Sequence, residues 1–116
     1  MVKKVLVVDD EFDDLSTMKS VLAGEGFSVF TATNGAQAMD QLKTDGFDLI
    51  LIDIRMPTLS GYDLVRLLKE RTNGKTRMMF VSIVPKQEVD LRGVDGFVQK
   101  PFSPKTLIAE VKKALK

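Results

Sequence analysis

The sequence predicts a doubly wound α/β domain, in which helices cover both faces of a five-stranded parallel sheet. Three unbroken apolar runs carry most of this prediction: Val5–Val8, Leu49–Ile52 and Met78–Val81. Runs of this length without polar alternation are typical of strands that are buried on both faces. Ser28–Ala32 is more mixed and suits an edge strand, and Phe97–Val98 is a short fifth candidate.

Amphipathic stretches separate these runs and predict the helices. Apolar residues recur at three- and four-residue spacing in residues 15–22, 36–42, 62–68 and 106–115, which places them on one face of a helix. Residues 86–92 leave room for only about two turns before Gly93. We therefore expect five helices, the fourth of them shortened.

Length and composition narrow the function further. A chain of 116 residues supports one core, so we expect a single domain over residues 1–116 without an output domain. Its 17 basic and 16 acidic residues leave a net charge of +1, which gives no electrostatic reason to bind nucleic acid directly. No apolar run reaches the roughly 20 residues of a membrane span, and no signal-peptide core is evident. We expect no membrane insertion and a cytoplasmic protein.

The absence of Cys and His excludes further chemistry. There is no disulfide or thiolate chemistry, no imidazole base, and no phosphohistidine carried by this chain. Any reaction must use carboxylates, hydroxyls and amines.

Reactive side chains follow four of the five predicted strands. Sheets of this class bind ligands beyond the carboxyl ends of their strands, where the strand order reverses. The first strand runs into Asp9-Asp10-Glu11, the third into Asp53, the fourth into Ser82 and the fifth into Lys100. A single aspartate at a strand end is more often a turn former or a helix cap, and a capping role could explain Asp13. The combination is what indicates a site.

The combination also indicates which chemistry. In the flavodoxin-like strand order 2-1-3-4-5 the first and third strands are neighbours, so Asp9, Asp10 and Asp53 would form one cluster. Three adjacent carboxylates repel one another and favour a bound cation, and oxygen ligands alone favour Mg²⁺. Lys100 would add a positive charge and Ser82 a hydroxyl. Such a site stabilises a transferring phosphoryl group, and without a nucleotide-binding loop the acceptor would be a carboxylate of the protein.

These motifs resemble a known family. Val5–Glu11, Asp53–Pro57 followed by Ser60-Gly61, and Lys100-Pro101-Phe102 are similar to the signature of response-regulator receiver domains of two-component signalling, the chemotaxis-Y-like family. The resemblance spans the whole chain. It implies that Asp53 is the phosphoacceptor and that Mg²⁺ is the cofactor. The implied Mg²⁺ ligands are Asp9, Asp10, Asp53 and the backbone carbonyl of Arg55.

The resemblance also implies a switch and its partners. Ser82 would reorient toward the phosphate, Lys100 would pair with it, and the rotamer of Phe97 would report the active state. The Lys100-Pro101 peptide would be cis. A sensor histidine kinase or histidine phosphotransfer protein would donate the phosphoryl group, and a downstream protein or a phosphorylation-dependent homodimer would receive the signal. The chain would not be an enzyme beyond catalysing its own phosphorylation and dephosphorylation.

Three departures from the family pattern keep an alternative open. Ile83 follows Ser82 where relatives have a small residue, and Phe97 lacks the hydroxyl of the more common Tyr and is equally explained by core packing. The stretch between Ser82 and Lys100 is shorter by about four residues, or one helical turn. A receiver fold that no longer switches and serves as a protein-docking module is therefore the alternative. A Mg²⁺-dependent phosphatase and a nucleotide binder are less well supported, because no cap domain or phosphate-binding glycine loop is present.

Overall fold

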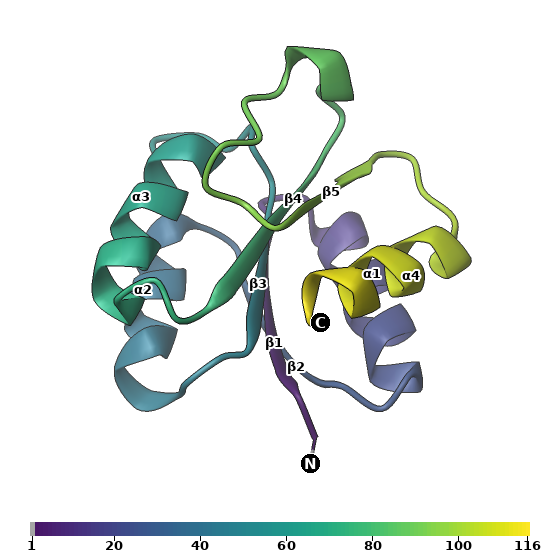
Figure 1. The fold of residues 1–116 in the computed structure, drawn as a ribbon, viewed down its shortest axis with the longest axis horizontal. Coiled ribbons are helices and arrows are strands. Elements are labelled where there is room, and N and C mark those ends of the chain that lie inside the picture. The colour runs from purple at the N-terminus through teal and green to yellow at the C-terminus, as the bar shows by residue number, and fades with distance from the viewer. Residues whose placement is uncertain (1) are drawn as a thin grey trace.

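The computed structural model describes residues 2–116. These residues form one parallel sheet with helices on both faces (Figure 1). The strand order is β2-β1-β3-β4-β5, which confirms the predicted order 2-1-3-4-5. The strands are β1 (Lys4–Val8), β2 (Ser28–Ala32), β3 (Leu49–Ile52), β4 (Arg77–Ser82) and β5 (Gly96–Gln99). The α-helices are α1 (Phe12–Gly24), α2 (Gly35–Thr44), α3 (Gly61–Thr72) and α4 (Pro104–Ala114).

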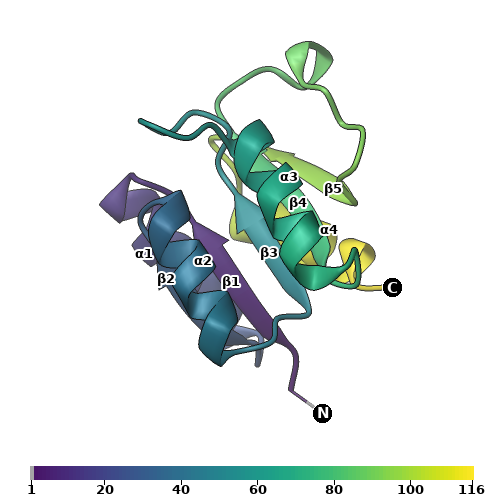
Figure 2. The same cartoon turned by 90° about the vertical axis from the view of Figure 1, so that its left-hand side faces the viewer.

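The core consists of two apolar layers separated by the sheet. Alternate residues of β1 enter opposite layers: Leu6 and Val8 pack with α2 and α3, whereas Val5 and Val7 pack with α1 and α4. Figure 2 shows α2 and α3 side by side on the first of these faces. All four residues are at most 1% exposed, which explains the unbroken apolar run, because both faces of the strand are covered. Burying each such side chain contributes about 1.5–3 kcal/mol.

Side-chain caps start three of the four helices in the described part of the chain. Asn34 accepts a hydrogen bond from the backbone of Gln37 to start α2, and Ser60 and Ser103 play the same part for α3 and α4. Helix α1 differs, because Glu11 occupies its N-cap position without a side-chain bond. Asp13 lies in the first turn of α1, so it is not the helix cap that the sequence left possible.

The predicted fourth helix over residues 86–92 is wrong, although the fold is otherwise as expected. Only Lys86–Glu88 form a single 3₁₀ turn, η1, and the chain is extended again at Val89. A segment this short cannot form enough intrahelical bonds to offset the cost of helix nucleation. Asp90 instead bonds the backbone and guanidinium of Arg92, which lowers the pKa of Asp90 to about 2, and Gly93 then turns the chain with φ at 86°.

Within residues 2–116, no helix combines the length and the apolar character that a membrane span would need.

Candidate functional site

The acidic cluster predicted from the sequence forms at the carboxyl ends of β1 and β3. Val8 and Ile52 are paired in the sheet, and the backbone N–H of Asp53 donates to the carbonyl of Val8 at 3.0 Å. This register brings the residues that follow the two strands together. Carboxylate oxygens of Asp9, Asp10 and Asp53 all lie within 4.8 Å of one another.

The members of this cluster differ in burial. Asp9 is fully buried and Asp53 is 6% exposed, whereas Asp10 is exposed. Burial disfavours the charged form and raises the pKa of Asp9 from 3.8 to about 6, even though a hydrogen bond from Lys100 acts in the opposite direction. A cation reaching the cluster past Asp10 would relieve this cost. The donor set is made of carboxylate oxygens without nitrogen or sulfur, which fits Mg²⁺.

Lys100 is the counter-charge of the cluster. Its Nζ donates to Asp9 at 2.6 Å, to Asp14 at 2.8 Å and to Asp53 at 3.2 Å, and its side chain is 6% exposed. Burial alone would lower the pKa of Lys100, but the hydrogen bonds to Asp14 and Asp9 and the charge of Asp53 outweigh burial and raise it. Lys100 faces three carboxylates and Asp10 adds a fourth to the cluster, so the site keeps a net negative charge that a divalent cation can balance.

The end of β5 places Lys100 in this position. The backbone N–H of Lys100 donates to the carbonyl of Ser82 at 2.9 Å, which ties the residue after β5 to the last residue of β4. The Lys100-Pro101 peptide is cis, as the resemblance implied.

Gly61 lets the loop after Asp53 fold closely against helix α3. A Cβ on Gly61 would lie 2.4 Å from the carbonyl oxygen of Asp53 and 2.7 Å from the Cα of Ile54. The N–H of Gly61 donates to Ile54 at 2.8 Å, and the N–H of Arg55 donates to the carboxylate of Asp53 at 3.3 Å. The backbone of Arg55 is therefore next to the carboxylate of Asp53, and the role of its carbonyl as a metal ligand stays a prediction.

Ser82 and Phe97 lie on neighbouring strands but in different surroundings. Ser82 is fully buried at the end of β4, where its Oγ accepts from the N–H of Val84 at 3.3 Å. Phe97 pairs with Phe80 across β4 and β5, is 9% exposed, and packs in the core layer under α2 and α3. Core packing thus accounts for Phe97 at rest, and its switch role stays a prediction. Ile83 is 57% exposed, so it is not packed into the site.

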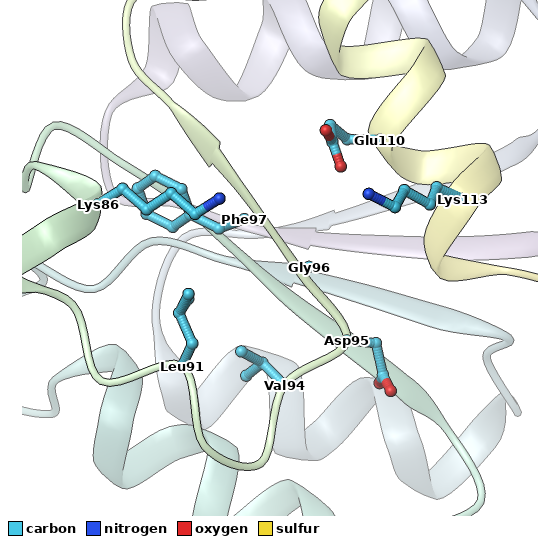
Figure 3. A pocket seen from close by; sticks show the side chains of 8 residues that line it. All are labelled: Lys86, Leu91, Val94, Asp95, Gly96, Phe97, Glu110 and Lys113. Carbon is cyan, nitrogen blue, oxygen red and sulfur yellow. The ribbon is translucent and has the colours of Figure 1, made fainter.

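Phe97 also borders a pocket that straddles β5, as Figure 3 shows. The pocket has a volume of about 240 Å³. Leu91 and Val94 line it on one side of the strand, and Glu110 and Lys113 of α4 line it on the other. Phe97 therefore has open space next to it, which a rotamer change requires.

Sequence reasoning missed Asp14, which accepts the second-shortest of the three hydrogen bonds from Lys100. An aspartate in a first helical turn usually interacts with the helix dipole, so its residue type gave no reason to place it in the site. Its spacing gave no signal either, because Asp13 and Asp14 both lie in the first turn of α1. Of the residues expected in the site, Asp9, Asp10, Asp53 and Lys100 come together as predicted.

Comparison with known proteins agrees with this geometry. The response regulator receiver domain family matches residues 5–112. Response regulator SaeR of Staphylococcus aureus (strain USA300) is 35% identical over 117 residues, covering 96% of this chain and 50% of SaeR. The chain therefore spans about half the length of the curated relatives it matches.

Solved structures with the same fold include two chains of similar length. Chemotaxis response regulator CheY4 of Vibrio cholerae is 30% identical with a TM-score of 0.87, covering 99% of this chain and 100% of that one. Response regulator TrrA of Thermotoga maritima, solved in complex with Mg(2+)-BeF, is 28% identical with a TM-score of 0.88, covering 98% and 100%. The flavodoxin-like sheet, the acidic cluster with its lysine and the match over residues 5–112 lead to one assignment: this chain belongs to the response regulator receiver domain family of two-component signalling.

Proposed function

We propose that this receiver accepts a phosphoryl group on Asp53 from a phosphohistidine of a partner protein in a Mg²⁺-dependent reaction. The observation that carries the proposal is the position of Asp53: its Oδ2 lies 3.2 Å from the Lys100 ammonium, inside a cluster of three carboxylates. A phosphoryl group bound there would meet a fixed positive charge and the oxygen ligands that Mg²⁺ prefers.

In this reaction an oxygen of Asp53 attacks the phosphorus atom. The new P–O bond forms as the P–N bond to the donor imidazole breaks, and the imidazole nitrogen keeps the bonding electrons. Lys100 stabilises the negative oxygens of the phosphoryl group. Asp9, Asp10, Asp53 and the carbonyl of Arg55 would hold Mg²⁺. The ion supplies charge neutralisation of the carboxylates and of the transferring group.

The activity that we propose stays within the chain. The site catalyses its own phosphorylation and, through water, its own dephosphorylation, and no turnover of other substrates is part of the proposal. Formation of an aspartyl phosphate replaces a single carboxylate charge by a phosphoryl group with several acceptor oxygens. The hydroxyl of Ser82 donates to one of these oxygens in the phosphorylated protein, and Phe97 repacks toward the pocket beside β5.

The partners follow from this chemistry. A sensor histidine kinase or a histidine phosphotransfer protein is the donor, and a downstream protein or a second copy of the chain recognises the phosphorylated form. We propose no direct contact with nucleic acid, consistent with the net charge of +1. We also propose a location in the cytoplasm. The Mg(2+)-BeF complex of TrrA supports the choice of ion.

Mass spectrometry after incubation with acetyl phosphate and Mg²⁺ tests the proposal. We expect the wild type to gain the mass of one phosphoryl group, and Asp53→Asn to gain nothing. Because an aspartyl phosphate can hydrolyse before it is weighed, beryllofluoride binding should be measured in parallel. A wild type that neither gains mass nor binds beryllofluoride contradicts the proposal.

A non-switching receiver that serves as a docking module is the second candidate. It is favoured by the single 3₁₀ turn at Lys86–Glu88 in place of a helix, and by the exposed Ile83. It predicts that Mg²⁺ and beryllofluoride leave the chemical shifts of residues around Ser82 and Phe97 unchanged. A clear response at both positions would exclude it.

A further inference from the structure

The ammonium of Lys100 uses all of its donors. It has three N–H groups, and they are taken by Asp9, Asp14 and Asp53 at 2.6, 2.8 and 3.2 Å. Two of these acceptors have roles in the proposed function: Asp53 accepts the phosphoryl group and Asp9 holds the metal ion. Asp14 has neither role, yet its bond to Lys100 is shorter than that of Asp53.

Asp14 is also held by a well-packed element. It lies in the first turn of α1, and the next buried residues of this helix, Leu15 and Met18, pack against the sheet. The side chain of Asp14 is 41% exposed, whereas that of Lys100 is 6% exposed. The bond therefore reaches from the rim of the site to a buried ammonium, and it joins residues 86 positions apart in the sequence.

We propose that Asp14 is a positioning residue that orients the Lys100 ammonium toward the phosphoryl group. This inference rests on the proposed function. The two short hydrogen bonds to Asp9 and Asp14 fix the rotation of the tetrahedral Nζ. The third N–H is then directed at Asp53, with which it forms the longest of the three hydrogen bonds. A Mg²⁺ ion would compete with Lys100 for the carboxylate of Asp9. Asp14 is then the anchor of Lys100 that is not shared with the metal ion, and a preoriented donor stabilises transferring charge best.

The negative charge of Asp14 opposes the stabilisation that comes from orienting Lys100. A carboxylate near the site repels an incoming phosphoryl group. Asn separates the two effects, because its amide oxygen still accepts a hydrogen bond from Lys100 while the charge is removed. Asp14→Ala removes both.

Binding titrations on the full chain provide the test. Beryllofluoride is titrated at saturating Mg²⁺, and Mg²⁺ is titrated alone, both followed by NMR chemical shifts. For Asp14→Ala we expect about a tenfold loss of beryllofluoride affinity, the size of one charge-assisted hydrogen bond, and a Mg²⁺ affinity that stays within about threefold of the wild type. We expect Asp14→Asn to bind beryllofluoride with an affinity within about threefold of the wild type.

Asp13→Ala is the matched control. It also removes an acid from the first turn of α1 and so loses the same interaction with the helix dipole, but Asp13 is exposed and makes no bond to Lys100 among the described residues. We expect it to bind both ligands as the wild type does. Urea denaturation of each variant checks that the fold is intact.

Three outcomes overturn the positioning role while leaving the proposed function in place. Asp14→Ala could bind beryllofluoride as tightly as the wild type, both Asp14 variants could bind it more tightly because repulsion dominates, or Mg²⁺ affinity could fall as much as beryllofluoride affinity. A wild type that binds no beryllofluoride overturns the proposed function and this role together. The expected pattern, a loss in Asp14→Ala that Asp14→Asn restores, is not explained by a structural effect alone.

Discussion

Replacing Gly61 by alanine should damage the fold and the site together. The added Cβ would lie 2.4 Å from the carbonyl oxygen of Asp53, 2.7 Å from the Cα of Ile54 and 3.0 Å from the carbonyl carbon of Asp53. All three neighbours are backbone atoms, so no rotamer change can make room. Either α3 moves away from the sheet or the segment after β3 shifts.

The loss of folding stability in Gly61→Ala can be bounded from the typical cost of overpacking a protein core. Forcing one extra carbon into a packed site typically costs about 1–3 kcal/mol, and displacing backbone places Gly61→Ala at the upper end. A domain of this kind has a free energy of unfolding of about 5–15 kcal/mol, so the variant should still fold. Two of the three displaced atoms belong to Asp53. We therefore also expect Mg²⁺ binding to weaken by about tenfold or more, since the carboxylate would leave the cluster geometry.

Urea denaturation and a Mg²⁺ titration measure the two effects. The control is Gly24→Ala: Gly24 ends α1, has no neighbour within 4 Å of the added Cβ, and should gain up to about 0.5–1 kcal/mol from better helix propensity. If Gly61→Ala unfolds at the same urea concentration as the wild type, with an unchanged slope and unchanged Mg²⁺ affinity, the argument from close backbone packing is refuted.

Three further predictions concern the charges of the site. Because the pKa of Asp9 is raised to about 6 in the folded protein, the folded state holds this proton more tightly than the unfolded state. Metal-free wild type should therefore lose a few kcal/mol of stability as the pH rises from about 4 to 6, and Asp9→Asn should lose less in the same urea series. Mg²⁺ at about 100 times its dissociation constant should stabilise the wild type by about 2.7 kcal/mol, measured by thermal unfolding. This gain in stability should vanish in Asp10→Ala. It should survive in Asp40→Asn, a control at an exposed residue that pairs with Lys43. Lys100→Met should destabilise the metal-free protein by about 3–5 kcal/mol, because it leaves buried carboxylates without their counter-charge, and added Mg²⁺ should restore part of that loss; equal urea midpoints for Lys100→Met and wild type would contradict this account.

The sheet was predictable because its signal is local. Val5–Val8 and Leu49–Ile52 have no polar residue to place on a solvated face, and this alone requires cover on both sides. The residues after these strands then had to meet at one edge. The acidic cluster followed from the strand order, without knowledge of any side-chain conformation.

The segment from Lys86 to Arg92 was not predictable in the same way. A helix of two turns depends on tertiary contacts rather than on its own propensity, and the pairing of Asp90 with Arg92 competes locally for the same backbone. Asp14 was missed for a related reason. Its partner Lys100 is far away in the sequence, and neither residue type nor spacing shows which first-turn carboxylate a distant ammonium will select.

The buried polar side chains of the resting site are all hydrogen-bonded, although the site carries a net negative charge. Within residues 2–116, every buried side-chain nitrogen or oxygen has a hydrogen-bond partner, including Lys100 and Ser82. A phosphoryl group must therefore exchange existing bonds rather than fill vacant ones. The hydrogen bond most easily exchanged is that from Lys100 to Asp53, because at 3.2 Å it is the longest of the three. Its acceptor also belongs to the residue that reacts in the proposed function. The anchor to Asp14 then limits how far Lys100 can move. The larger rearrangement in the proposed switch therefore falls to Ser82, whose Oγ has a single hydrogen bond within residues 2–116, accepted from the N–H of Val84 at 3.3 Å.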